Sequence, residues 1–383
     1  MRDLLPAEKQ RREQLISLIR DTYRARGFQE IETPAVEAIE RLSSGQGGDN
    51  EKLVFKVLKR GEELERAISE GEELADLGLR FDLTVPLTRY FASNRASLPR
   101  VLKAIQIGPV WRAERPQKGR YRQFLQCDID ILGESSVLAE LELISASLAA
   151  LDAIGLSKAT IRVNDRALLK SALEKAGIST NQESAMIAID KLDKIGLDKV
   201  VEEIAAGWGS EPAGKVRDWL SESVSGWPAE LSWVEELGDS AQRLRYDPSL
   251  VRGMGYYTGA IFEIEYPGVE SSIGGGGRYD EMVGRWAGSD SPAAGISLGI
   301  ERIIEIAELV ADSQQRSIVI LIDNDAAGAL RLQKELIAEG YSVRIERKAK
   351  NTKAQLEELA ASGWQSFAYQ SPTRAELEIR PLS

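Results

Sequence analysis

The segment from Val110 to Phe124, VWRAERPQKGRYRQF, gathers positive charge and aromatic rings in a short stretch of an acidic chain. Its charged residues are the cations Arg112, Arg115, Lys118, Arg120 and Arg122 and the carboxylate Glu114. Arginine donates paired hydrogen bonds to phosphate oxygens, and an aromatic ring stacks on a flat base. The segment therefore suits a nucleotide, although a run of charge is more often a solvated face of the protein.

A second group of candidates consists of polar residues within apolar, strand-like stretches. These are Asp82, Gln126, Asp130, Tyr256 and Tyr257. Gln126 and Asp130 are four residues apart, so on a strand they lie on one face and reach the same cavity. Each residue alone is more often a satisfied polar group of the core, but their number favours a polar pocket.

Two further features are compatible with ligand binding. Arg302 follows an apolar strand at the start of a helix, where a cation can lie near phosphate. The glycine run Gly274–Gly277 indicates a backbone that approaches a ligand or another strand closely. A glycine run by itself is more often a loop, and this one is not a phosphate-binding P-loop because no Gly-Lys-Ser/Thr follows.

Composition excludes several kinds of chemistry. The 383 residues include no histidine and one cysteine, Cys127, which rules out a Ser-His-Asp triad, a His-ligated metal and a disulfide within the chain. The net charge of −11 argues against wholesale coating of nucleic acid or anionic membrane. We find no signal peptide and no run of about 18 apolar residues, so we expect a cytoplasmic protein without a membrane span.

Hydrophobic periodicity indicates how these residues are positioned. It predicts an amphipathic helix over residues 7–26, then a strand at FQEIETP. VLKAIQIGPVWRAE and RQFLQCDIDILG predict an antiparallel hairpin whose loop carries the cations, with Arg112 and Glu114 on one face of a strand. Residues 166–240 read as an inserted helical segment. From Ser317 onward a β-α-β-α-β-β series predicts a separate α/β domain.

Charge is divided unevenly between these parts. Residues 315–383 hold ten Lys and Arg against nine Asp and Glu, a net charge of +1, which leaves −12 for the remainder. A polyanion would therefore be repelled least by the C-terminal domain.

These segments together resemble the histidyl branch of the class II aminoacyl-tRNA synthetases over roughly residues 2 to 310. VWRAERPQKGRYRQFLQCDID is similar to motif 2, GISLGIERI to motif 3, and the helix ending at Gly27 with FQEIETPAVE to motif 1. LVRGMGYYTG is similar to the histidine-specific signature, and RFDLTVPLTR and GGGGRYD match two more segments. The C-terminal domain matches only loosely.

The resemblance implies an α+β fold with a mainly antiparallel sheet of six or seven strands flanked by helices. It implies a catalytic domain over residues 1–165 and 241–312, with a helical insertion over 166–240. Residues 316–383 would form a small α/β domain of the anticodon-binding kind. Motif 1 builds the dimer interface in that class, so a homodimer is expected.

The implied activity forms histidyl-adenylate and pyrophosphate from L-histidine and ATP with Mg²⁺, then transfers the histidyl group to the terminal ribose of tRNA(His). Arg112 and Arg252 would be catalytic, clamping the α-phosphate and the substrate carboxylate. The implied histidine-binding residues are Asp82, Leu83, Thr84, Arg112, Gln126, Asp130, Arg252, Tyr256 and Tyr257. The implied ATP-binding residues are Arg112, Glu114, Arg120, Tyr121, Phe124 and Arg302.

The chain departs from the family pattern at several places. Gly255 stands where Asp is usual, and Asp165 stands where the family has His in an Asn-His-Arg triplet. The short C-terminal domain has Gln370-Ser371-Pro372-Thr373 in place of a Gly-x-x-Glu turn. Two other interpretations stay open: a non-catalytic regulatory subunit of ATP phosphoribosyltransferase, and a paralogue that activates histidine for an acceptor other than tRNA.

Overall fold

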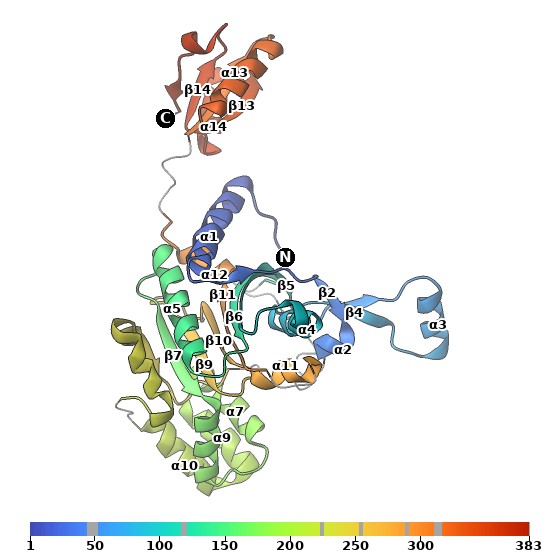
Figure 1. Cartoon of the computed structure of the whole chain (residues 1–383), viewed down its shortest axis with the longest axis vertical. Helices are drawn as coiled ribbons and strands as arrows, with labels where there is room; N and C mark the ends of the chain where they lie inside the picture. The colour runs from blue at the N-terminus through green and yellow to red at the C-terminus, as the bar shows by residue number, and fades with distance from the viewer. Residues whose placement is uncertain are drawn as a thin grey trace. The chain divides into compact units, whose positions relative to one another are not determined.

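The computed structural model describes most of the chain (Figure 1). The described residues are 1–43, 53–115, 121–222, 226–252, 256–287, 291–309 and 316–382. The predicted loop cations Lys118 and Arg120, and the unusual Gly255, lie outside these ranges. Contacts divide the chain into two compact units, residues 1–3 with 12–308 and residues 4–11 with 309–383.

The first unit is built on an eight-stranded sheet of order β1-β5-β6-β11-β10-β9-β7-β8. The strands are β1 (Gln29–Glu30), β5 (Leu102–Trp111), β6 (Gln123–Leu132), β7 (Thr160–Asp165), β8 (Leu244–Tyr246), β9 (Ala260–Glu265), β10 (Gly274–Arg278) and β11 (Ala293–Gly299). The six strands from β5 to β7 pair antiparallel, and β1 and β8 add parallel edges. The α+β class is therefore confirmed, and the sheet has one strand more than the six or seven expected, with β1 inside the segment FQEIETP that was predicted to form a strand.

Strand β6 shows how the sequence assigns the two faces of this sheet. Cys127, Ile129 and Ile131 are buried and alternate with the polar Gln126, Asp128 and Asp130. Helices α5 (Leu138–Ala153) and α12 (Ile300–Ile306) pack against β6 and β11. Helix α1 (Pro6–Arg24), expected over residues 7–26, buries Leu15, Ile16, Ile19 and Tyr23.

A smaller three-stranded sheet of order β2-β4-β3 precedes the long hairpin. Its strands are β2 (Val36–Ala38), β3 (Lys56–Leu58) and β4 (Ala75–Leu79), with helices α2 (Ile39–Ser43) and α3 (Glu62–Glu70) between them. Helix α4 (Thr84–Asn94), followed by a short 3-10 turn at Arg95–Ser97, packs against α11 (Asp280–Ala287). Thr84 begins α4 and Asp82 lies just before it, and both line a cavity together with residues of the central sheet.

The segment predicted to be helical and inserted does form helices. They are α6 (Arg166–Ala176), α7 (Gln182–Ile189), α8 (Leu192–Ile195), α9 (Leu197–Trp208) and α10 (Ser210–Ser221), followed by the 3-10 segment η3 (Ala229–Arg243). Asp165, the unusual residue of the triplet, caps α6 by accepting a 2.7 Å hydrogen bond from the backbone N–H of Ala167. The borders of this insertion remain a prediction, because its helices belong to the same compact unit as the sheet.

The second unit contains the expected β-α-β-α-β-β series. It consists of β12 (Arg316–Ile322), α13 (Ala326–Ala338), β13 (Tyr341–Arg347), α14 (Thr352–Ala361), β14 (Ser366–Tyr369), a 3-10 turn at Arg374–Glu376 and β15 (Arg380–Pro381). Its sheet has the order β13-β12-β14-β15, with β12 parallel to both neighbours. Gln370 donates hydrogen bonds to Asp325, the cap of α13, at 2.8 and 2.9 Å, which ties the divergent turn to the helix.

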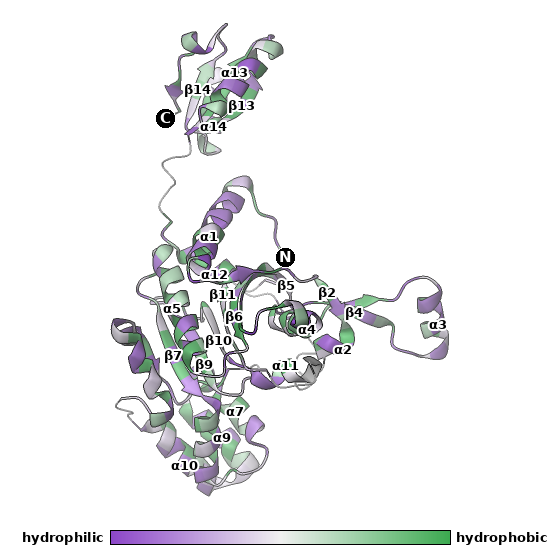
Figure 2. Ribbon diagram, in the orientation of Figure 1, coloured by the Kyte–Doolittle hydropathy of each residue, from purple (hydrophilic) through white to green (hydrophobic). Residues whose placement is uncertain are grey.

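Hydropathy follows the layers within each unit. In Figure 2 strands such as β6 carry much of the green of apolar residues, whereas purple is prominent along helix α1. None of the helices within the described residues is long and apolar enough to cross a membrane.

Candidate active site

A cavity of about 120 Å³ lies on the polar face of the central sheet. It is lined by Asp82, Thr84, Arg112, Gln126, Asp128, Asp130, Arg252, Tyr256, Tyr257, Gly275, Gly276, Tyr279, Gly295, Ile296 and Ser297. Eight of the nine residues predicted to bind histidine are in this group. The ninth, Leu83, is buried, and its carbonyl accepts a 3.0 Å hydrogen bond from Gln106.

One wall of the cavity is acidic because strand β6 alternates. Gln126, Asp128 and Asp130 share its polar face and are all buried. Asp130 accepts a 2.6 Å hydrogen bond from the hydroxyl of Tyr279, and Gln126 donates one of 2.7 Å to Ser297. The second oxygen of Asp130, one oxygen of Asp128 and the amide oxygen of Gln126 have no hydrogen-bond partner among the described residues. These buried acceptors suit N–H donors of a ligand.

Asp82 adds a third carboxylate from the loop before α4. Its Oδ1 accepts a 3.0 Å hydrogen bond from the backbone N–H of Val85, and its Oδ2 is buried without a partner in the described part of the chain. Burial raises the pKa of Asp82 to about 6, opposed by that hydrogen bond and by Arg112. Burial likewise raises the pKa of Asp130 to about 7, against the hydrogen bond from Tyr279.

Asp128 completes the acidic wall, and burial, together with the charge of Asp130, raises its pKa well above the usual range. Burial and mutual repulsion oppose the ionisation of three carboxylates in one cavity, even with Arg112 nearby. A cationic ligand group would offset this cost.

Arg112 lines the same cavity and also contacts an aromatic ring. The prediction that Arg112 and Glu114 alternate on a strand was wrong, since β5 ends at Trp111. The backbone N–H of Arg112 still donates to the carbonyl of Arg122, but that of Ala113 donates to the carbonyl of Leu53 instead. The Nε of Arg112 donates a 3.0 Å hydrogen bond to the carbonyl of Phe81, and its guanidinium lies 5.1 Å from the centroid of the Phe124 ring. These contacts fix the arginine at the edge of the cavity.

Arg252 is the second cation, and its backbone is strained. Its φ of 62° lies in the left-handed region, which a side chain with a Cβ adopts at a cost of order 1 kcal/mol. Its Nη1 donates a 2.9 Å hydrogen bond to Glu263. Burial alone would lower the pKa of Arg252, but Tyr257 and Glu263 outweigh it and the pKa is raised, so the guanidinium stays charged.

The glycine run forms strand β10 rather than a loop, and it makes room for these groups. A Cβ on Gly275 would lie 2.8 Å from the guanidinium carbon of Arg252. A Cβ on Gly295, in β11, would lie 1.9 Å from Oδ1 of Asp130. The glycines therefore allow the side chains of Arg252 and Asp130 to lie close to the backbone of the sheet, as the sequence had suggested as one interpretation of the run.

The residues predicted to bind ATP are less closely grouped. Phe124 and Tyr121 line a second cavity of about 40 Å³, together with Arg2, Arg12, Pro109, Gln123, Leu125 and Glu301. Arg302 donates a hydrogen bond to the carbonyl of Ser272. The side chain of Glu114 is exposed, and Arg120 lies outside the described residues. The assignment of an ATP site to these residues stays a prediction.

Sequence reasoning overlooked Asp128, Tyr279, Ser297 and Gly295. The alternation that placed Gln126 and Asp130 on one face also places Asp128 there, so its signal was present. Tyr279 and Asp130 are 149 residues apart in the sequence, and no local pattern predicts a contact between such distant residues. The cavity thus combines three carboxylates with two arginines, which suits a small molecule that carries both basic and anionic groups.

Comparisons with known proteins agree with this geometry. A family model described as histidyl-tRNA synthetase matches residues 1–303. A histidine–tRNA ligase of Leifsonia xyli subsp. xyli is 49% identical over all of this chain and 97% of its own length. A probable histidine–tRNA ligase of Tropheryma whipplei (strain Twist) is 37% identical over 97% of this chain and 95% of its own.

Solved structures show the same fold. The crystal structure of histidyl-tRNA synthetase from Nostoc sp. PCC 7120 has a TM-score of 0.77 and 25% identity, covering 100% of this chain and 93% of that one. An ATP phosphoribosyltransferase regulatory subunit/histidyl-tRNA synthetase from Bacillus halodurans C has a TM-score of 0.76 at 20% identity, covering 97% and 96%. On the family model and the identity to these ligases, this chain belongs to the histidyl-tRNA synthetase family.

Proposed function

We propose that this chain is a histidine–tRNA ligase that activates L-histidine with ATP and transfers the histidyl group to the 3′ end of tRNA(His). The observation that carries the proposal is the cavity in which three buried carboxylates face two arginines. Histidine offers an ammonium group and an imidazole to the carboxylates, and a carboxylate to the arginines. The 49% identity to a histidine–tRNA ligase over the whole chain supports the same activity.

Each part of histidine has a partner in the cavity. Asp82, with Thr84 beside it, would accept hydrogen bonds from the ammonium group. Asp130 and Tyr257 would bind the two imidazole nitrogens, with Tyr256 and Gln126 nearby. Two opposed polar partners discriminate strongly, because a ligand of the same shape without the nitrogens leaves buried groups unpaired. The unpaired oxygens of Asp82 and Asp130 support these roles.

The chemical step requires position and charge rather than a base. The substrate carboxylate is already ionised at neutral pH, so one of its oxygens attacks the α-phosphorus of ATP directly. A new P–O bond forms to the carboxylate, and the bond to pyrophosphate breaks. Arg112 and Arg252 would hold the carboxylate and the α-phosphate in line and stabilise the negative charge that develops. The step needs no histidine side chain of the protein, because it needs no general base.

ATP would extend from Arg112 toward Phe124, whose ring would stack on the adenine. Tyr121 lines the same small cavity as Phe124, and Glu114, Arg120 and Arg302 complete the proposed ATP set. Mg²⁺ would accompany ATP and neutralise phosphate charge, and its protein ligands remain unassigned.

We also propose a cytoplasmic homodimer. The segment that resembles motif 1 supports the dimer, and so do exposed apolar side chains on the small sheet. Val36, Leu58 and Leu77 there are 39%, 56% and 40% exposed. Sedimentation equilibrium should give about twice the mass of one chain, and a mass of one chain across the micromolar range would contradict the dimer.

Histidine-dependent exchange of pyrophosphate into ATP is the decisive test of the activity. The purified protein should catalyse exchange with L-histidine, and Arg252→Gln should reduce its rate at least about a hundredfold, as loss of a charge-stabilising group does. Charging of a tRNA(His) transcript should accompany exchange. Absence of exchange would favour the non-catalytic regulatory subunit, and exchange without charging would favour an acceptor other than tRNA.

A further inference from the structure

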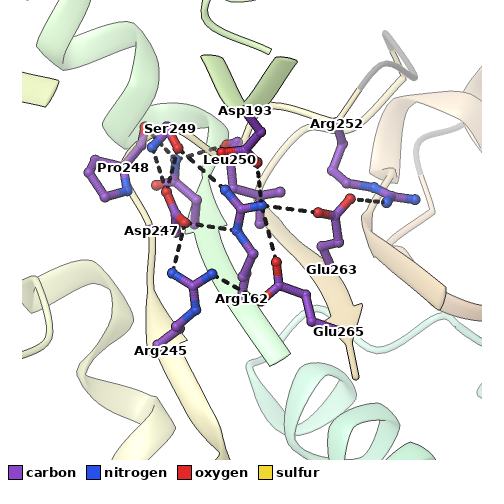
Figure 3. A network of polar contacts seen from close by, with 11 residues as sticks. Arg162, Asp193, Arg245, Asp247, Pro248, Ser249, Leu250, Arg252, Glu263 and Glu265 are labelled. Atoms are coloured by element: carbon purple, nitrogen blue, oxygen red, sulfur yellow. Dashed lines mark hydrogen bonds and ion pairs between the residues drawn. The ribbon is translucent and has the colours of Figure 1, made fainter. Parts of the chain in front are cut away.

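A buried arginine, Arg162 on β7, connects the helical insertion to the candidate active site (Figure 3). Its side chain is 7% exposed, and it is surrounded by four carboxylates. They are Asp193 on α8 of the insertion, Asp247 after β8, and Glu263 and Glu265 on β9. The proposed reaction gives Arg162 no role, because it does not line the cavity described above.

The two ends of the Arg162 guanidinium are held differently. Its Nε donates a 2.7 Å hydrogen bond to the buried Asp247, which also binds Arg245 and Ser249. This end is fixed. Its Nη1 lies 2.8 Å from Asp193, 3.3 Å from Glu263 and 3.4 Å from Glu265. A guanidinium nitrogen carries two hydrogens, so these three acceptors compete for them, and Asp193 has the shortest contact.

Glu263 is the link to Arg252. One of its oxygens accepts the 3.3 Å contact from Arg162, and the other accepts the 2.9 Å hydrogen bond from Arg252. Figure 3 shows Glu263 between the two arginines. If the Glu263 carboxylate moves closer to Arg162, its hydrogen bond to Arg252 becomes weaker. The strength of the hydrogen bond between Glu263 and Arg252 therefore depends on whether Asp193 occupies Nη1 of Arg162.

We infer that Asp193 is a positioning residue for Arg252, which it affects through Arg162 and Glu263. By occupying Nη1 of Arg162, Asp193 leaves Glu263 to orient the Arg252 guanidinium toward the cavity. The side chain of Asp193 is 69% exposed, on a helix of four residues, so this contact can be lost without opening the core. The placement of the insertion thereby sets the orientation of an active-site cation. The inference rests on the proposed function.

The test compares two isosteric substitutions in the same insertion. Asp193→Asn removes the charge that competes for Arg162. Asp198→Asn is the matched control, since Asp198 is also exposed and ion-paired, to Arg217 at 2.8 Å, but it belongs to no contact of this network. In pyrophosphate exchange by the full chain, D193N should lower kcat about fivefold, because part of a charge-assisted hydrogen bond to Arg252 is lost. D198N should stay within about twofold of wild type.

A double-mutant cycle identifies the route. In a Glu263→Gln background the substitution D193N should change kcat by less than about twofold, because the intermediate carboxylate is already absent. The free energies of unfolding of the same four proteins should also be non-additive for Asp193 and Glu263. Equal falls in kcat in both backgrounds, additive unfolding energies, or a D193N rate equal to wild type would overturn the inference.

The unfolding measurement needs no substrate. A wild-type protein without exchange activity would refute the proposed function, and the coupling between Asp193 and Glu263 would still be measured.

Discussion

Buried carboxylates dominate the chemistry of the cavity at the scale of single residues. The pKa of Asp82 lies near 6 and that of Asp130 near 7, both raised chiefly by burial. A carboxyl whose folded-state pKa is raised stabilises the fold in its protonated form. That contribution is present at low pH and is lost as the pH rises from about 4, the unfolded value, through 6 to 7. A cationic ligand compensates for the loss.

Histidine binding should therefore strengthen as the pH rises. Ionisation of Asp82 alone, with a pKa near 6, should make the affinity at pH 5.5 about fourfold weaker than at pH 8. Titration calorimetry at the two pH values measures this ratio. Asp82→Asn is the matched variant, since its side-chain oxygen can still accept the hydrogen bond from Val85. It should bind histidine more weakly and with a flatter pH profile, and equal profiles for both proteins would exclude Asp82 as the titrating group.

Strands β10 and β11 act at the next scale, because their glycines decide how closely the side chains of β6 and Arg252 approach the sheet. Gly295 pairs with Asp130 across the β11–β6 ladder. It therefore faces the carboxylate that the proposed function assigns to the imidazole. The absence of a side chain at this position is a requirement of the site rather than of strand formation.

Gly295→Ala should impair histidine recognition. The added Cβ would lie 1.9 Å from Oδ1 of Asp130, so the carboxylate must move from its position against Tyr279. We expect kcat/KM for histidine in the exchange assay to fall at least about tenfold, a change of about 1.4 kcal/mol.

Gly207→Ala in α9 is the control for this substitution. An added Cβ there meets nothing within 4 Å, and alanine favours a helix by up to about 1 kcal/mol. G207A should keep wild-type kinetics and unfold at the same or a higher temperature. Similar kinetics for G295A and G207A would show that histidine recognition does not depend on the position of the Asp130 carboxylate.

At the scale of the whole molecule, the chain divides into two compact units. Every residue of the larger cavity belongs to the first unit. The second unit has its own buried clusters on both faces of its sheet, including Ile318 and Ile320 on one and Val319 and Leu321 on the other. Its residues carry a small positive charge in an acidic chain.

A chain that ends at Glu308 should separate the two steps of the reaction. Histidine-dependent exchange should stay within about threefold of the full chain, because the groups that hold the substrates are retained. Charging of tRNA(His) at limiting tRNA should fall at least about tenfold, since the less repulsive surface for a polyanion is removed. Circular dichroism confirms that the shortened chain is folded. Equal loss of both activities would show that the second unit also supports the cavity.

The sequence by itself determined the features that depend on residues close together in the chain. Alternation along β6 placed Gln126 and Asp130 together, helical periodicity located α1, and the series after Ser317 specified the second unit. The resemblance of short motifs identified the family, because residues of one motif keep their spacing in the chain. These features depend on neighbours within one strand or helix.

Only the tertiary structure decided which segments meet. Tyr279 reaches Asp130, Gly295 makes room for it, and Glu263 joins Arg162 to Arg252 because the sheet order brings together strands that are distant in sequence. The tertiary structure also showed that Arg112 lies beyond the end of β5, on which alternation had placed it. Hydrophobic patterning records which face of a strand is buried, but not which strand lies beside it, so contacts across the sheet have no local signal.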